Sequence, residues 1–269
     1  MGQQPFLEKL RVEKPLVHNI ANIVVSNFQA NGLLALGASP MMAEGIEEVA
    51  EMAALADCTV LNIGTLDQGT VLSIIEAGKS ANKKGIPVVL DPVGVGASVF
   101  RKKSVTTILK EVQVTAIRCN VGELATLGNI EWQSRGADAG EGQIDVQLTA
   151  KQVAKRLNCI VAVTGFEDTV TDGQTTIQID GGHDLMPLIT GSGCLLSAVT
   201  GAFLAVSDGH HLQATANALS FYKQVGERAA KTAIAPGTFA VEMINSLYSL
   251  TSENLRNNMK IVEKEDIQI

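Results

Sequence analysis

Three short apolar segments, each followed by polar residues, constrain the fold of this chain more than any other feature. They are Ile86–Leu90, Val114–Ile117 and Cys159–Val163. Strands that are apolar on both faces are typical of parallel sheets whose two faces are covered by helices. Amphipathic helical segments alternate with these strands along the chain, as such a sheet requires. We therefore expect an α/β fold with a mainly parallel central sheet and helices on both faces.

The rest of the chain continues this alternation, with one change of character near its later sheet edge. A further strand is expected at Cys58–Ile63, and a short strand or loop at Ala38–Ala43. The expected helices are Ala21–Leu36, Ile46–Ala56, Gly69–Lys84, Leu195–Val206, Leu212–Lys231 and Phe239–Leu250. Residues 168–180 alternate around an Asp-Gly turn, which predicts an antiparallel hairpin at one edge. Trp132–Gly142 reads as a mobile surface loop, so we expect one domain over residues 1–269.

Charge and cysteine spacing exclude several classes of protein. The net charge of −7 argues against nucleic acid or an anionic membrane as a partner. No apolar run is long enough to span a membrane. The four cysteines match no zinc or CxxC pattern, and no signal-peptide pattern precedes them. We therefore expect free thiols and a cytoplasmic location.

Polar residues occur where the apolar strands stop. They are Asp91, Arg118, Asn120, Glu123 and Thr164. Ligands of open parallel sheets bind at the carboxyl ends of the strands. The two carboxylates with an amide could hold Mg²⁺ through waters, and the arginine could bind phosphate oxygens. An alternative is that Asn120 caps a helix and Glu123 is its capping-box partner.

The segment Thr190-Gly191-Ser192-Gly193-Cys194 leads into a long apolar helix. Its two glycines allow a sharp turn and a close approach to a ligand. The helix N-terminus after them would attract an anion, so this turn could hold a phosphate that is being transferred. On the first helical turn, the pKa of the Cys194 thiol would be lowered. A tight loop before a core helix explains the same residues equally well.

Two nucleotide-binding motifs are absent. Gly78-Lys79-Ser80 has Ser73 where a phosphate-binding loop needs glycine, and Gly94-Val95-Gly96 lacks the third glycine of a dinucleotide site. From their surroundings alone, Met42 reads as a core residue, and His18 as a structural or substrate-lining residue.

Taken together, these residues resemble the ribokinase-like superfamily and, within it, the hydroxyethylthiazole kinase family. The resembling segments are residues 15–18, 31–40 with 42–43, 61–66, 90–94, 117–123, 163–165 and 190–194. The resemblance spans almost the whole chain in order. It implies phosphorylation by ATP of the hydroxyl of 4-methyl-5-(2-hydroxyethyl)thiazole, a salvage step toward thiamine diphosphate.

The resemblance also implies roles for single residues. Arg118 and Thr164, with Asn120, would bind ATP, and Asp91 and Glu123 would lie at the Mg²⁺–phosphate centre. Met42, Gly191 and His18 would bind the thiazole, while Gly191, Gly193 and Cys194 would form the catalytic turn. Cys194 stands where the wider superfamily has an aspartate base, and as a thiol it would be a weak base. A homotrimer with shared sites is implied as well.

Several positions depart from the family pattern. Ala21 and Ile23 replace polar residues near His18, and Cys119, Gly122 and Ser192 are changes among small residues. Two alternatives stay open: a kinase of the same fold acting on hydroxymethylpyrimidine or a sugar, and a nucleotide-binding protein without catalysis. An assay of ATP consumption with each acceptor distinguishes them.

Overall fold

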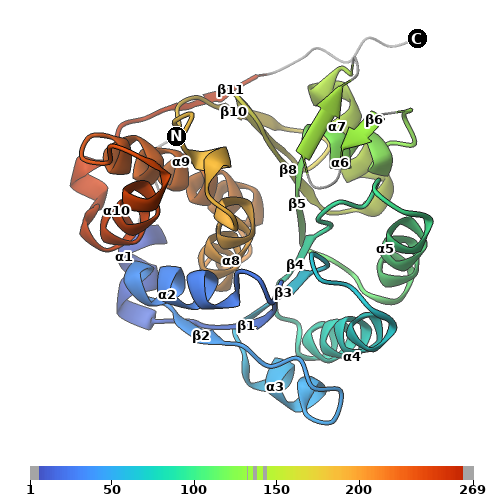
Figure 1. Cartoon of the computed structure of the whole chain (residues 1–269). Helices are drawn as coiled ribbons and strands as arrows, with labels where there is room; N and C mark the ends of the chain where they lie inside the picture. Colours follow the sequence, from blue (N-terminus) through green and yellow to red (C-terminus); the bar gives the residue numbers. More distant parts are fainter. Residues whose placement is uncertain (1–5, 132, 136–137, 142–143, 263–269) are drawn as a thin grey trace.

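The computed structural model describes residues 6–131, 133–135, 138–141 and 144–262, and within them a nine-stranded sheet forms the centre (Figure 1). The strand order is β11-β10-β9-β8-β5-β4-β3-β1-β2. The strands are β1 (Leu16–Ile20), β2 (Ser39–Met41), β3 (Cys58–Asn62), β4 (Val88–Asp91), β5 (Ala116–Asn120), β8 (Ile160–Thr164), β9 (Asp168–Thr171), β10 (Thr176–Ile179) and β11 (Met259–Ile261). All pairs from β2 to β8 are parallel, and β9, β10 and β11 are antiparallel. The expected α/β fold with an antiparallel edge is confirmed.

Helices cover both faces of this sheet (Figure 1). One face carries α1 (Phe6–Glu13), α2 (Ser26–Leu36), α8 (Ser192–Ala205), α9 (His211–Ala230) and α10 (Pro236–Ser249). The other carries α3 (Val49–Leu55), α4 (Gln68–Lys84), α5 (Val99–Glu111), α6 (Val121–Leu127) and α7 (Val146–Leu157). Successive strand residues point to opposite faces, so Val60 joins the first core and Leu61 the second. Two short 3-10 helices, Met186–Leu188 and Ser252–Asn254, complete the chain.

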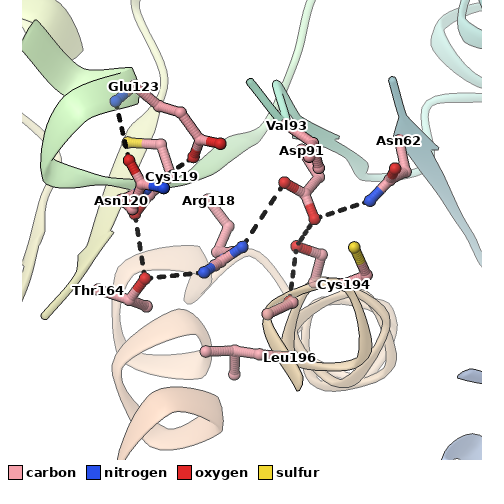
Figure 2. Close-up of polar contacts among 12 residues, drawn as sticks. Asn62, Asp91, Val93, Arg118, Cys119, Asn120, Glu123, Thr164, Cys194 and Leu196 are labelled. Atoms are coloured by element: carbon pink, nitrogen blue, oxygen red, sulfur yellow. Dashed lines mark hydrogen bonds and ion pairs between the residues drawn. The ribbon is translucent and has the colours of Figure 1, made fainter. Parts of the chain in front are cut away.

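Helix α8 lies in the middle of its layer and is buried along most of its length. Small residues let it approach the sheet: a Cβ atom at Gly201 would lie 2.7 Å from Val60 Cγ2 of β3. Burial on all sides explains why the sequence of α8 is mostly apolar, with Ser and Thr as its polar residues. Packed in this way, the helix directs its N-terminus toward the carboxyl ends of β4, β5 and β8 (Figure 2).

Two helices begin later than the sequence predicts. The expected helix from Ala21 begins at Ser26, because Asn22 forms a turn in which its Oδ1 accepts a hydrogen bond from Val24 N at 3.0 Å. The expected helix from Ile46 begins at Val49, after a turn from Gly45 to Glu48. A side-chain turn bond therefore competes with helical bonds before α2, and a backbone turn from Gly45 to Glu48 leads into α3.

The prediction that Trp132–Gly142 is a loop is wrong for its described part. Gln133–Arg135 (β6) and Asp138–Glu141 (β7) pair as a separate antiparallel two-stranded sheet. Residues 132, 136–137 and 142 of that segment lie outside the described residues. The segment has no alternation of apolar residues by which to predict a strand.

The parallel strands extend further toward the polar residues than predicted. Asp91, Asn120 and Thr164 are the last residues of β4, β5 and β8, and Arg118 lies inside β5. The strand backbone therefore fixes where these side chains start. By contrast, Gly78-Lys79-Ser80 lies inside α4, as expected for a segment that is not a phosphate-binding loop.

Candidate active site

Adjacent strand ends and one helix N-terminus bring polar side chains together (Figure 2). Asp91, Arg118 and Thr164 come from β4, β5 and β8, which are neighbours in the sheet. Gly191 directly precedes the first residue of α8, and Gly193 of the same turn lies against the Arg118 guanidinium. This is the edge at which ligands of open α/β sheets bind.

Arg118 is the centre of the cluster. Its Nη2 donates a hydrogen bond to Thr164 Oγ1 at 2.8 Å, and its Nη1 lies 3.6 Å from Asp91 Oδ1. The guanidinium packs against the start of α8, because a Cβ atom at Gly193 would lie 2.7 Å from Nη1. Burial lowers the pKa of Arg118, but attraction by Asp91 and Glu123 outweighs burial and raises it. A buried, charged arginine therefore lies beside the N-terminus of α8.

Asp91 is completely buried and has two firm partners. Its Oδ2 accepts hydrogen bonds from Asn62 Nδ2 at 2.8 Å and from Ser197 Oγ at 2.7 Å. Its Oδ1 has no hydrogen-bond donor within the described part of the chain and faces Arg118. Burial raises the pKa of Asp91, and the Arg118 charge and the two hydrogen bonds oppose that rise.

Asn120 and Glu123 form the capping box that was the alternative to a metal-site role. Asn120 Oδ1 accepts a hydrogen bond from Glu123 N at 2.9 Å, and Glu123 Oε2 accepts one from Asn120 N at 2.8 Å. Glu123 Oε1 also accepts from Gly94 N at 2.9 Å. Burial, followed by repulsion from Asp91, raises the pKa of Glu123 to about 7. The cap fixes this carboxylate near Asp91 and Arg118.

The glycine turn has a left-handed backbone and close packing that only glycine fits at Gly191. Gly191 has φ 89°, and a Cβ atom there would lie 2.6 Å from Val25 Cγ1 of the loop before α2. Tyr222 donates a hydrogen bond to Ser192 O at 2.8 Å. The first i→i−4 hydrogen bond of α8 joins Leu195 N to Gly191 O. The amides of the residues before Leu195 therefore take no part in the helical hydrogen bonds.

The expectation of a lowered thiol pKa at Cys194 is wrong. Burial, followed by repulsion from Asp91, raises the pKa of Cys194 to about 12, while a hydrogen bond with the Asn62 amide opposes the rise. The residue is 8% exposed, and the favourable N-terminus of α8 does not offset the loss of hydration. The thiol is therefore protonated at neutral pH.

Comparison with known proteins places this geometry in a family. A model of the hydroxyethylthiazole kinase family matches residues 7–253. The hydroxyethylthiazole kinase of Exiguobacterium sp. is 50% identical over 250 residues, which are 93% of this chain and 95% of that protein. The chain belongs to the hydroxyethylthiazole kinase family.

Solved structures agree with this family at the level of the fold. The hydroxyethylthiazole kinase structure from Pyrococcus horikoshii is 42% identical, with a TM-score of 0.87 over 96% of this chain and 98% of that one. A ribokinase-like superfamily protein from Enterococcus faecalis is 13% identical, with a TM-score of 0.66 over 92% of this chain and 90% of that one. The fold is therefore ribokinase-like.

The residues that the resemblance to hydroxyethylthiazole kinases implies fall into two groups in the structure. The phosphate-side residues Asp91, Arg118, Asn120, Glu123, Thr164 and Cys194 lie together (Figure 2), and Gly193, two residues after Gly191, lies against Arg118. His18 lies in β1 and Met42 directly after β2, which are two and three strands from β4. His18 is completely buried, with Nε2 2.7 Å from Ala43 O, whereas Met42 is partly exposed.

Sequence reasoning missed Asn62 and Ser197, which hold Asp91. Asn62 ends β3 and could have been found by the same signal as Asp91, a polar residue where an apolar strand stops. Ser197 follows Cys194 by three residues, so the two share one face of α8. Tyr222 gave no signal, because its contact with Ser192 depends on how α9 packs against α8.

The residues present fit a water-mediated Mg²⁺ site rather than a protein cage. Within the described residues, no group of three or more acidic, histidine or cysteine side chains could hold a metal. Asp91 Oδ1 is left without a hydrogen-bond donor there, and Glu123 is fixed close by. One or two carboxylates beside phosphates are what Mg²⁺ ordinarily uses.

The cysteines and the helices bear on the expectations of free thiols and of no membrane span. All four cysteines are free and buried, so no disulfide is formed. Among the helices of the described residues, none has the length and apolar character to cross a bilayer.

Proposed function

We propose that the protein transfers the γ-phosphoryl group of ATP to the hydroxyl of 4-methyl-5-(2-hydroxyethyl)thiazole. The alcohol oxygen forms a bond to the γ-phosphorus, the bond from that phosphorus to the β,γ-bridging oxygen breaks, and ADP leaves. The hydroxyl proton is released as the thiazole phosphate forms. The observation that carries this proposal is the buried Arg118 guanidinium, packed against Gly193 between Asp91 and Thr164.

The N-terminus of α8 and Arg118 supply the charge that phosphoryl transfer requires. This reaction depends on positioning and electrostatic stabilisation more than on covalent help from the protein. The transferred phosphoryl group, as its charge develops, would be bound by the Arg118 guanidinium and by the backbone amides at the start of α8 that precede its first helical hydrogen bond. The helix end favours an anion there. Thr164, which accepts a hydrogen bond from Arg118, would contact the nucleotide on the β8 side, with Asn120 beside it.

Asp91 and Glu123 would hold Mg²⁺ through waters. The ion, when bound beside the triphosphate, offsets phosphate charge and orients the oxygens. Asp91 is kept in place by Asn62 and Ser197, and Glu123 by the capping box. Both carboxylates are therefore positioned before any ligand arrives.

Cys194 would lie beside the attacking hydroxyl as a neutral thiol. Because its pKa is raised to about 12, the thiol keeps its own proton at neutral pH and does not accept the alcohol proton before the transition state. In a loose transition state, the alcohol keeps its proton until late, so a strong base is not required. Gly191 would complete the thiazole pocket with Met42 and His18.

A homotrimer in the cytoplasm is the assembly and location that we propose. Exposed apolar side chains lie near the carboxyl ends of β1 and β2, at the sheet edge that includes Met42: Ile23 and Val24 are 68% and 69% exposed. A second copy covering this edge would bury them and close the pocket. The four free cysteines are consistent with a reducing compartment.

One assay tests the proposed reaction. ATP consumption is measured with the thiazole alcohol, with hydroxymethylpyrimidine and with ribose, for the wild type and for Arg118→Ala. We expect turnover only with the thiazole alcohol, and a loss of at least about 100-fold in Arg118→Ala. Turnover only with either of the other acceptors overturns the substrate. Nucleotide binding without turnover of any acceptor overturns catalysis.

A further inference from the structure

A second buried cation, Lys223 of α9, lies next to the phosphate cluster but outside it. The residue is 5% exposed. Its Nζ donates to the carbonyl oxygens of Gly165 at 3.2 Å, Phe166 at 3.0 Å and Gly181 at 3.0 Å. It also lies 3.2 Å from Asp168 Oδ1. Four oxygens therefore surround one ammonium group inside the protein.

Two of these carbonyls belong to the loop that follows Thr164. The loop runs from the end of β8 to the start of β9, and Gly165 N donates to Asp168 Oδ1 at 3.0 Å. The Phe166 ring is 99% exposed, so side-chain packing of this ring does not hold the loop. Polar contacts therefore hold residues 165–168: the charged pair of Lys223 and Asp168, and a surface hydrogen bond from Gln178 Nε2 to Glu167 Oε2 at 2.6 Å.

Helix α9 anchors both sides of the phosphate site from consecutive residues. Tyr222 holds Ser192 O of the glycine turn, and Lys223 holds the loop after Thr164. One helix thus sets the spacing between the N-terminus of α8 and the end of β8. A buried pair that served the core alone would be replaceable by apolar residues without loss. Lys223 of this pair instead donates to the backbone carbonyls of the loop after Thr164, where the proposed function places the nucleotide.

We propose that Lys223 is a positioning residue for the nucleotide, acting as an internal cation that holds the Gly165–Asp168 loop. This inference rests on the proposed function, because that function places ATP at Thr164. Loss of the ammonium would release the loop and weaken nucleotide binding, while His18 and Met42, which lie four and five strands from β8, would be unaffected.

The test measures ADP binding by calorimetry in the presence of Mg²⁺ and without an acceptor. Lys223→Met keeps all but the last atom of the side chain's length and removes the charge, and Asp168→Asn is a milder change to the same pair. Lys231→Met, an exposed lysine directly after α9, is the matched control. We expect the ADP dissociation constant to rise about tenfold in Lys223→Met and to stay within about twofold in the control. In turnover assays, the KM for ATP should rise while the KM for the thiazole alcohol is unchanged.

A third variant separates positioning from general stability. Lys223→Ala leaves the four oxygens in place without their cation. Ammonium chloride should then restore much of the ADP affinity, whereas tetramethylammonium chloride at the same ionic strength should not. Lys223→Met should not respond, because its terminal methyl group lies one bond length from the ammonium position and leaves no room for a free ammonium ion.

The outcomes distinguish this inference from the proposed function. ADP binding within twofold of the wild type in folded Lys223→Met and Asp168→Asn overturns the role of Lys223 and leaves the function intact. Weakened binding in Lys223→Ala that ammonium does not restore also overturns it. A wild-type protein that binds no ADP overturns the proposed function itself.

Discussion

The Cys194 thiol, with a pKa raised to about 12, is a poor proton acceptor at neutral pH. Loss of a general base ordinarily costs about 100-fold or more in rate. Because the thiol does not act as one, we expect Cys194→Ala to lower kcat by less than about tenfold. Steady-state kinetics at saturating ATP and thiazole alcohol measure this. The pH profile of kcat should also show no inflection that the variant removes.

A large loss of kcat in Cys194→Ala would contradict this prediction. If Cys194→Ala lost about 100-fold or more in kcat with unchanged substrate affinity, proton removal by the thiol would be required in spite of its burial. A matched Ser207→Ala variant, in which a buried small polar side chain outside the cluster is shortened, controls for general loss of packing.

Glu123 makes the stability of the protein depend on pH. Its folded-state pKa is about 7 against an ordinary 4.5, so the folded state binds more protons than the unfolded state between these values. Stability therefore falls as pH rises through that window, and the fall is complete above pH 7. Its upper size is about 3 kcal/mol.

Glu123→Gln removes the part of the pH dependence of stability that Glu123 contributes. The amide offers one acceptor oxygen where the capping box and Gly94 use two, so the variant should be less stable at every pH. Its loss of stability between pH 5 and 8 should nevertheless be smaller than that of the wild type. Urea unfolding at both pH values measures the difference. Equal pH dependence in the two proteins would show that another group carries it.

At the scale of elements, the start of α8 depends on the absence of a side chain at Gly193. A Cβ atom there would meet Arg118 Nη1 at 2.7 Å and move the guanidinium away from Thr164 and Asp91. We expect Gly193→Ala to lower kcat/KM for ATP by about 100-fold, because a positioned charge at the phosphoryl group is lost. Steady-state kinetics with varied ATP test it.

A glycine in open space supplies the control. A Cβ atom at Gly237, in the first turn of α10, meets nothing within 4 Å, so Gly237→Ala should keep full activity. The melting temperature of Gly193→Ala should change little, since the displaced atoms are the end of one side chain. A large drop in melting temperature together with activity would attribute the effect to folding instead.

The parallel strands were predictable because burial on both faces leaves them apolar from end to end, as in Val88–Leu90. The carboxyl ends of such strands share one edge, so Asp91, Arg118 and Thr164 could be placed together without coordinates. The β6–β7 pair could not be found, because short polar strands carry no burial pattern. The starts of α2 and α3 were also missed: the Asn22 side chain bonds the backbone of its own turn, and a single turn from Gly45 to Glu48 precedes α3.

For the site as a whole, residue types were easier to predict than protonation states. Glu123 could be assigned both to a capping box and to a charged cluster from its spacing, and the cap is confirmed. The raised pKa of Cys194 depends on how completely the fold buries the thiol and on its proximity to Asp91, which no local pattern shows. Lys223 was missed because its four oxygen partners come from two segments, residues 165–168 and Gly181, that lie far from it in the sequence.

At the scale of the whole molecule, the exposed apolar residues at the edge of β1 and β2 should be covered by another copy of the chain. We expect sedimentation equilibrium to give about three times the chain mass of 28.3 kDa. Val24→Glu places a charge in that contact and should produce monomers with weak turnover, because the pocket near Met42 stays open. Val99→Glu makes the same change at a 71% exposed position of α5 on the other face and should leave both trimer and activity intact. A fully active monomer, in the wild type or in Val24→Glu, would show that one chain holds a complete site.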